Sequence, residues 1–597
     1  MSIPTDAWVK ICTASAPAFS KDGSKIFHLR GTQPLGSGLP QVWVMDADGS
    51  NPTQLSAHDE KVAFLRRAPN DDRLIWGIDA GGDERQQFHL WDQGATKALT
   101  AAPGVIHDLG GFSPDGSKIA YAANARDERY FDIHVMDLAT GADTRLIEGH
   151  GILTVPGWHP DGTRLTVIHD LSGGDQFLHV LDIASCTLTE MPRPSPSRYS
   201  AMRWVKGAEL LMGLTDQGGH DFMRLCQLDP ATGACTEIYV APGRDLDSWS
   251  LSPDGAQLAT IENDRGYAIM RIGPVDGERS IVTLPDGIAA DLAWAPDSVS
   301  LAFSLQGPTR PSGIWLWRAG VAAPLFEADM KADAGIDPAE LITPSLISWT
   351  SFDGKTIPGW YMLPKSAKPA AGYPIVVWVH GGPSSQTRGN FRPDIQALLS
   401  QGFAVMMPNM RGSTGYGRAY MDADELELRP DVMADLAAGH AWVKAQPEID
   451  PTRIGIMGQS YGGWVTLAAV TLQPDFWKAA VNFYGIADFV TLLERTGPWR
   501  AIHRAHEYGF PGTHDHLFDK ISPLRHVDNV TAPLLMLHGD RDPRVPQNES
   551  DIFTEAMEQR QKKVRYERFT YAGHGFIRPD HRRRVYATIT EHFNAYL

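Results

Sequence analysis

The chain has 597 residues, of which 43% are hydrophobic and 21% are charged, proportions that are typical of an ordinary soluble globular protein. This length exceeds what one hydrophobic core supports, so two or three domains are expected. The formal net charge of -17 argues against nucleic acid or an anionic membrane as a partner.

The cysteines and the apolar segments together predict a cytoplasmic location. The first ten residues lack the basic and then apolar segments of a secretory signal, and no uninterrupted apolar stretch approaches membrane-spanning length. The cysteines are too few and too scattered for a disulfide framework or a zinc ribbon (Cys12, Cys186, Cys226 and Cys235).

A tight-turn signal recurs through the first half of the chain. Ser-Pro-Asp-Gly at 113–116 and at 252–255 are two clear copies, each followed by a short run of β-forming residues. Seven such anchors recur every 43 to 49 residues, if the degenerate copy at 205–208 is included. Four short strands per unit at this period are typical of propeller blades, whereas a pair of β-sandwiches would not explain the regular spacing. The repeat predicts a seven-bladed β-propeller over about residues 14–328.

The pattern changes after a polar, helix-compatible linker around residues 327–339. Strand-like apolar runs, among them 375–379, 454–457 and 534–537, then alternate with helical segments. Such alternation predicts a doubly wound, mainly parallel sheet covered by helices on both faces, as in an α/β-hydrolase domain. We expect the β-propeller domain to cover residues 1–330 and the α/β-hydrolase domain to cover residues 331–597.

The strand-like run at 454–457 leads into Gly-Gln-Ser-Tyr-Gly at 458–462, and an apolar helix-forming run follows. A strand, a Gly-x-Ser-x-Gly turn and a helix make a nucleophile elbow, in which the serine is exposed on a strained turn. The bare motif is weak, because a glycine-rich loop with an idle serine would also match it. The flanking strand and helix favour Ser460 as a nucleophile.

An acid and a histidine follow this serine in the order that α/β-hydrolases use. Two carboxylates, Asp540 and Asp542, follow the strand at 534–537. We favour Asp542, because the acid must reach out of the strand end toward a separate loop. His574 lies between two glycines on such a loop. We therefore expect Ser460, Asp542 and His574 to form a catalytic triad.

The oxyanion that develops on an attacked carbonyl needs two N–H donors aimed at one point. One is expected from Tyr461, the residue after the nucleophile, at the start of the new helix. The other is expected from the loop His-Gly-Gly-Pro at 380–383, where the lack of side chains lets the backbone approach a substrate closely. Within that loop we favour the N–H of Gly382.

These motifs, with Asn-Met-Arg-Gly-Ser-Thr-Gly-Tyr-Gly at 409–417, resemble those of the prolyl oligopeptidase family of serine peptidases. The resemblance covers the whole chain and is closest to the acylaminoacyl-peptidase and bacterial dipeptidyl-peptidase branch. It implies hydrolysis of short peptides in a cavity between the domains, with the propeller excluding folded proteins. His380 departs from the pattern, because relatives of the prolyl oligopeptidase and dipeptidyl-peptidase-IV types carry an oxyanion-binding tyrosine there. Strict cleavage after proline is therefore not expected.

The resemblance also implies two substrate-binding residues. Arg544, two residues after the expected triad acid, matches an arginine at the substrate site of acylaminoacyl peptidases. In those enzymes the arginine can pair with a glutamate of the propeller, and Glu84 is the match here. The acidic pairs at 83–84 and 127–128 would favour a substrate with a free amine if they faced the cavity, although such pairs are usually just solvated.

Four histidines between residues 503 and 516 fit neither His-Glu-x-x-His nor another zinc-binding spacing (His503, His506, His514 and His516). We expect this segment to be a loop that lines the substrate cavity. No metal ion and no organic cofactor is expected.

Together these features predict a cytoplasmic serine peptidase that cleaves short peptides through an acyl-enzyme intermediate. An esterase, amidase or isopeptidase could use the same triad, and a propeller scaffold with an inactive hydrolase domain is the non-enzymatic alternative. The sequence leaves open whether substrates have an acylated or a free amino terminus, and whether the chain forms a homo-oligomer.

Overall fold

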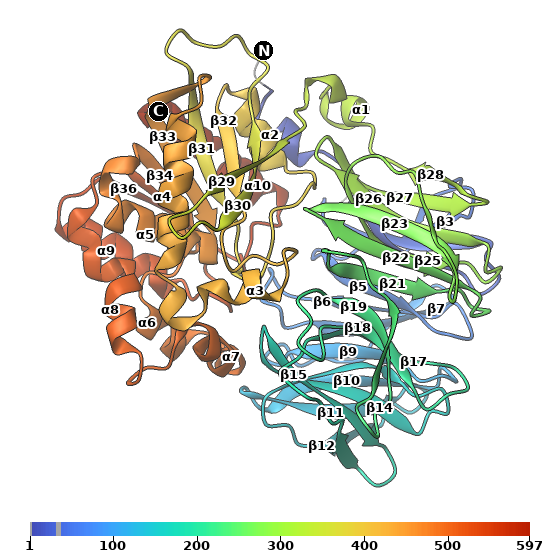
Figure 1. The fold of residues 1–597 in the computed structure, drawn as a ribbon. Coiled ribbons are helices and arrows are strands. Elements are labelled where there is room, and N and C mark those ends of the chain that lie inside the picture. Colours follow the sequence, from blue (N-terminus) through green and yellow to red (C-terminus); the bar gives the residue numbers. More distant parts are fainter. Residues whose placement is uncertain (1–2, 32–37) are drawn as a thin grey trace.

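The computed structural model describes residues 3–31 and 38–597, which fold into two domains that lie side by side (Figure 1). In the N-terminal part, the described residues form seven sheets, each made of four consecutive antiparallel strands. The sheets comprise strands β1 (Thr13–Phe19) to β4 (Thr53–Gln54), β5 (Val62–Arg67) to β8 (Ala95–Ala98), β9 (His107–Phe112) to β12 (Asp143–Ile147), β13 (Ile152–Trp158) to β16 (Thr187–Glu190), β17 (Tyr199–Trp204) to β20 (Cys235–Tyr239), β21 (Leu246–Leu251) to β24 (Ser280–Ile281), and β25 (Ile288–Trp294) to β28 (Val321–Phe326).

These sheets are the blades of a closed ring, because every pair of neighbouring blades shares an apolar layer. The layer between the last and the first blade joins Ile314 to Ile26, residues that lie almost a whole domain apart in the sequence. Ser312 Oγ also donates a 2.7 Å hydrogen bond across this junction to the carbonyl oxygen of Ala14. The prediction of a seven-bladed β-propeller is confirmed.

The C-terminal part contains one eight-stranded sheet in the order β29-β30-β32-β31-β33-β34-β35-β36. β30 pairs antiparallel with both of its neighbours, β29 and β32. All other pairings in the sheet, from β32–β31 to β35–β36, are parallel. The strands are β29 (Ser345–Thr350), β30 (Thr356–Met362), β31 (Tyr373–Val379), β32 (Ala404–Pro408), β33 (Ile449–Gln459), β34 (Ala479–Phe483), β35 (Leu534–Gly539) and β36 (Val564–Phe569).

Both faces of this sheet are buried, which explains why the strands β31 and β32 contain no charged residue. Along β31, Ile375 and Val377 enter one core, whereas Val376 and Trp378 enter the core on the other face. The helices are α1 (Met330–Ala334), α2 (Pro393–Ser400), α3 (Arg418–Met421), α4 (Asp431–Lys444), α5 (Tyr461–Leu472), α6 (Phe489–Arg495), α7 (Pro498–Tyr508), α8 (Asp515–Ile521), α9 (Asn548–Gln559) and α10 (Pro579–Tyr596). The prediction of an α/β-hydrolase fold is confirmed.

Two segments differ from what the sequence predicts. The histidine-containing segment expected to be a loop is largely helical, since α7 and α8 occupy it. The 3-10 turn Ala7–Val9 precedes the first blade but packs in the hydrolase core with Phe593 of α10. The proposed boundary between residues 330 and 331 stays a prediction.

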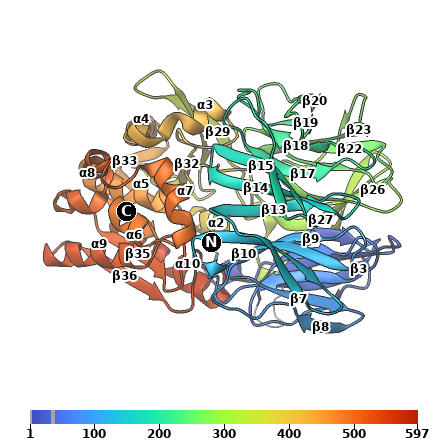
Figure 2. The same cartoon turned by 90° about the horizontal axis from the view of Figure 1, so that it is seen from below.

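Helix α7 belongs to the hydrolase domain and packs against the propeller. Its first turn places Trp499 in the apolar layer between the third and fourth blades, where Phe131 and Leu153 also lie. Seen from below, α7 lies between the helices of the hydrolase domain and the strands β13 and β14 (Arg164–Ser172) of the fourth blade (Figure 2). Across the described ranges, no helix combines the length and the apolar character that spanning a bilayer needs.

Candidate active site

The expected nucleophile, Ser460, lies on the sharp turn between β33 and α5. Its backbone has φ 57° and ψ -119°, a conformation that costs free energy for a residue with a side chain. The flanking glycines are required by close packing, since a Cβ on Gly458 would lie 2.2 Å from the carbonyl oxygen of Gly462. A Cβ on Gly462 would lie 2.2 Å from the carbonyl oxygen of Val379. The Gly-x-Ser-x-Gly sequence is therefore what this strained turn demands.

The structure places Asp542 beside His574. His574 Nδ1 and Asp542 Oδ2 are 2.6 Å apart, and the side chain of Asp542 is fully buried. Its other oxygen, Oδ1, accepts hydrogen bonds from the backbone N–H groups of Arg544 (2.9 Å) and Val545 (3.0 Å). Burial alone would raise the pKa of Asp542, but the charge of His574 and hydrogen bonds from His538 and His574 hold that pKa well below its usual value. Asp542 is therefore a carboxylate that holds the ring of His574 by Nδ1.

The competing carboxylate, Asp540, has a different environment. It is exposed, and its Oδ1 accepts a 3.3 Å hydrogen bond from the N–H of Ala572 rather than contacting His574. His538, at the end of β35, is fully buried between Ser550 Oγ (2.7 Å) and the carbonyl oxygen of Val545 (2.9 Å). It supports the loop that carries Asp542.

Ser460 and His574 line one cavity of about 930 Å³ between the domains. Gly382 and Arg544 of the hydrolase and Glu84 of the propeller line it too. A larger cavity of about 1170 Å³ lies within the propeller and is lined by neither Ser460 nor His574, so its size says nothing about catalysis. The cavity that holds the candidate catalytic groups is therefore walled by both domains.

The two expected oxyanion-binding residues flank this serine. Tyr461 is the first residue of α5, so its N–H belongs to the first turn, which has no acceptor within the helix. The loop with Gly382 lies against the elbow, because a Cβ on Gly381 would be 3.2 Å from Ser460 Cβ. Burial lowers the pKa of His380 to about 4, so its ring is neutral at pH 7. That ring contacts the carbonyl oxygen of Gly381 (2.7 Å) and Ser413 Oγ (3.0 Å), which fixes the loop.

Arg544 and Glu84 meet across the domain gap. Arg544 Nε donates to Glu84 Oε1 at 2.5 Å, and their side chains are 44% and 29% exposed. Because the backbone N–H of Arg544 is bound by Asp542, the arginine is fixed relative to the candidate acid. The pair forms part of the cavity wall.

Several residues of the site are not among those expected from the sequence. Tyr484 follows β34, has φ 37°, and packs its ring 4.5 Å from that of His574, measured between centroids. The cavity wall also includes Asp170 and Arg198 from the propeller and His503 from α7. Only the position of His503 on a cavity-lining segment was foreseeable, because no local motif surrounds the other three.

The profile of the prolyl oligopeptidase family matches residues 390–597. The C-terminal part of the chain is therefore similar to this family of serine peptidases. The sequence is 28% identical to dipeptidyl aminopeptidase BIII of Pseudoxanthomonas mexicana over 94% of this chain and 84% of that protein. It is also 28% identical to the human acylamino-acid-releasing enzyme, over 33% of this chain and 28% of that enzyme.

Solved structures share the complete two-domain fold. A puromycin-hydrolyzing peptidase of Mycobacterium tuberculosis superposes with a TM-score of 0.87 at 21% identity, covering 100% of this chain and 96% of that one. An acylaminoacyl peptidase of Pyrococcus horikoshii gives a TM-score of 0.77 at 18% identity, covering 100% and 98%. The prediction of a serine peptidase with a propeller and a hydrolase domain is confirmed.

Proposed function

We propose that the protein hydrolyses short peptides with Ser460 as nucleophile, His574 as general base and acid, and Asp542 as the group that orients His574. The observation that carries this assignment is the 2.6 Å contact between His574 Nδ1 and Asp542 Oδ2 in a cavity that Ser460 also lines. A carboxylate on Nδ1 keeps the proton there and leaves Nε2 free to accept the proton of a serine hydroxyl.

In the proposed reaction, Ser460 Oγ attacks the scissile carbonyl while His574 takes its proton. The N–H groups of Tyr461 and Gly382 bind the oxyanion, and His574 then donates the proton to the leaving amine. Water, deprotonated by His574, hydrolyses the resulting acyl-enzyme and restores the serine. Each step uses groups of this chain and needs no cofactor.

Short peptides are the proposed substrates because the propeller forms one wall of the cavity, as the position of Glu84 illustrates. The relatives named above are a dipeptidyl aminopeptidase and an acylamino-acid-releasing enzyme, so peptides with a free and with an acylated amino terminus both stay candidate substrates here. The cytoplasmic location and the possible formation of a homo-oligomer stay predictions.

The test is a screen of tri- to hexapeptides, each with a free and with an acylated amino terminus, against the wild-type protein and Ser460→Ala. We expect wild type to cleave members of the screen and Ser460→Ala to lose almost all of that activity without a change in circular dichroism. A fluorophosphonate probe should label wild type at Ser460 only. Equal cleavage by both proteins would refute the nucleophile, and rapid digestion of a folded protein substrate would refute the role of the propeller.

A further inference from the structure

Arg198 of the propeller faces the cavity that Ser460 and His574 line, although no motif marks it in the sequence. It precedes β17 in the fifth blade, and its side chain is 13% exposed. Its Nε donates to Asp216 Oδ2 at 2.6 Å. The two terminal nitrogens lack such a partner, and they are the part of a guanidinium that binds carboxylates best.

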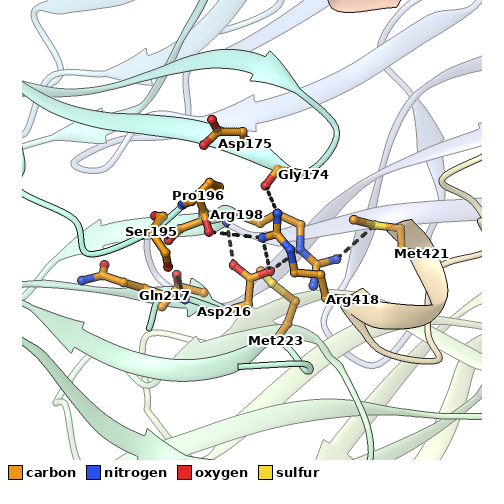
Figure 3. Close-up of polar contacts among 12 residues, drawn as sticks. Gly174, Asp175, Ser195, Pro196, Arg198, Asp216, Gln217, Met223, Arg418 and Met421 are labelled. Carbon is orange, nitrogen blue, oxygen red and sulfur yellow. Dashed lines mark hydrogen bonds and ion pairs between the residues drawn. The ribbon is translucent and has the colours of Figure 1, made fainter. Parts of the chain in front are cut away.

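The terminal nitrogens of Arg198 find no oxygen acceptor among residues 3–31 and 38–597. Nη2 is buried without a hydrogen-bond partner there, and Nη1 lies 3.4 Å from the sulfur of Met421, which is a weak acceptor (Figure 3). A buried N–H of a charged group is costly to leave unpaired. The thioether of Met421, which also lines the cavity, is a flexible neighbour that a ligand can displace.

The counter-charge of Arg198 is shared. Asp216 is completely buried, and its Oδ2 also accepts a 3.2 Å hydrogen bond from Arg418 Nη1 of α3 (Figure 3). Arg418 binds Asp422 as well, at 3.1 Å. Asp216 therefore holds Arg198 in position but shares its negative charge between two arginines. Asp422 forms its hydrogen bond with Arg418.

The charge of the cavity wall favours an anionic ligand. Of the described residues that line the cavity, five are Lys or Arg and three are Asp or Glu, although the whole chain carries a formal charge of -17. Two of these cations pair with carboxylates of the same wall, Arg544 with Glu84 and Arg504 with Glu507, and Arg392 pairs with Asp394. Among the described residues, Arg198 is thus one of the few cations of the wall whose terminal nitrogens lack a carboxylate. An excess of positive charge in the wall of a low-dielectric cleft favours a ligand of negative charge.

We propose that Arg198 is a specificity-determining residue that binds a substrate carboxylate through its terminal nitrogens. This inference rests on the proposed peptidase function and concerns the same cavity. The carboxylate can come from two sources, the carboxyl terminus of a short peptide or an acidic side chain. Either source supplies the two oxygens that a guanidinium fork binds best.

The experiment takes the peptide that wild type cleaves fastest in the screen above and makes it in three forms. They are the free acid, the C-terminal amide, and the amide with glutamate as the last residue. We expect wild type to prefer the acid to the amide by about 10- to 100-fold in kcat/KM, mainly through KM, as for a hydrogen bond to a charged group. In Arg198→Gln this ratio should fall at least tenfold. Arg198→Lys should restore part of it, because a point charge replaces the fork.

The matched control is Arg129→Gln, which removes an exposed propeller arginine paired with Asp127 outside the cavity, and its ratio should equal that of wild type. Recovery of cleavage by the glutamate amide would assign the site to any carboxylate, whereas no recovery would assign it to the carboxyl terminus. An acid-to-amide ratio that is the same in wild type and Arg198→Gln would overturn the proposal, provided that wild type cleaves the peptide. If wild type cleaves no peptide of the screen, the proposed function itself fails.

Discussion

Replacement of Asp542 by asparagine tests the geometry of the candidate triad most directly. The asparagine can keep its carbonyl oxygen where Oδ1 accepts the N–H groups of Arg544 and Val545. Its NH₂ group then replaces Oδ2, which lies 2.6 Å from His574 Nδ1. Two donors cannot face each other at that distance, so His574 must move its proton from Nδ1 to Nε2.

The expected loss follows from this change of tautomer. A His574 that carries its proton on Nε2 cannot accept the proton of Ser460, although the oxyanion donors and the cavity remain. Turnover should fall by about 10⁴, as when a triad acid is replaced by its amide in other serine hydrolases. That factor corresponds to about 5.5 kcal/mol of lost transition-state stabilisation. The effect should appear in kcat, because the carboxylate does not contact the substrate.

The assay compares kcat for Asp542→Asn and Asp540→Asn on the same peptide, with circular dichroism as a check that both variants are folded. Asp540 is the matched control, since it is two residues away, exposed, and bonded to the N–H of Ala572. Asp540→Asn should change kcat less than tenfold. A larger loss for Asp540→Asn than for Asp542→Asn would refute the assignment of the acid.

Two further predictions concern the walls of the cavity. Arg544→Ala should raise KM several-fold but lower the melting temperature by less than about 1 °C, because an ion pair this exposed contributes about 1 kcal/mol or less to stability. Kinetics on acylated and free-amine peptides check this, with Glu84→Gln measured in parallel. An unchanged KM would show that Arg544 does not bind the substrate. Burial raises the pKa of Asp170 to about 6. Burial also lowers the pKa of the neighbouring His503 to about 4, so this histidine supplies no positive charge at pH 7. The folded state thus binds the Asp170 proton more tightly than the unfolded state, and wild type loses stability as the pH rises from about 4 to about 6. The melting temperature of Asp170→Asn minus that of wild type should therefore increase by up to about 2 °C between pH 4 and pH 8, and a difference independent of pH would contradict the reasoning.

Local sequence signals are enough for the fold and for the expected triad residues. The propeller is readable because most blades repeat a turn whose aspartate binds its own loop, as Asp115 does with Ser113 Oγ (2.6 Å) and the N–H of Ser117 (3.0 Å). The elbow is readable because a strained serine needs glycines beside it. Both signals arise within a few residues, where spacing in the sequence determines spacing in the structure.

The rest of the cavity could not be predicted in the same way. Arg198 and Asp170 come from the propeller and reach the hydrolase site only when the domains dock, so nothing near them in the sequence refers to a serine more than 250 residues away. The prediction of a loop for the histidine segment is wrong, because the segment is mostly polar and the large apolar residue that fixes its helix packs on the other domain. Trp499 is buried in the propeller rather than in the core of its own domain.

The docking of the two domains also bears on catalysis itself. The N–H of Gly573, the residue before His574, donates a 2.8 Å hydrogen bond to the carbonyl oxygen of Gly81 in the second blade. The fit there is tight, since a Cβ on Gly573 would lie 1.8 Å from the carbonyl oxygen of Gly82. The ion pair of Arg544 with Glu84 anchors the loop of Asp542 to the same blade. Both loops that carry the candidate acid and base are thus held against one blade, so we expect the propeller to position these two groups in addition to forming a wall of the cavity.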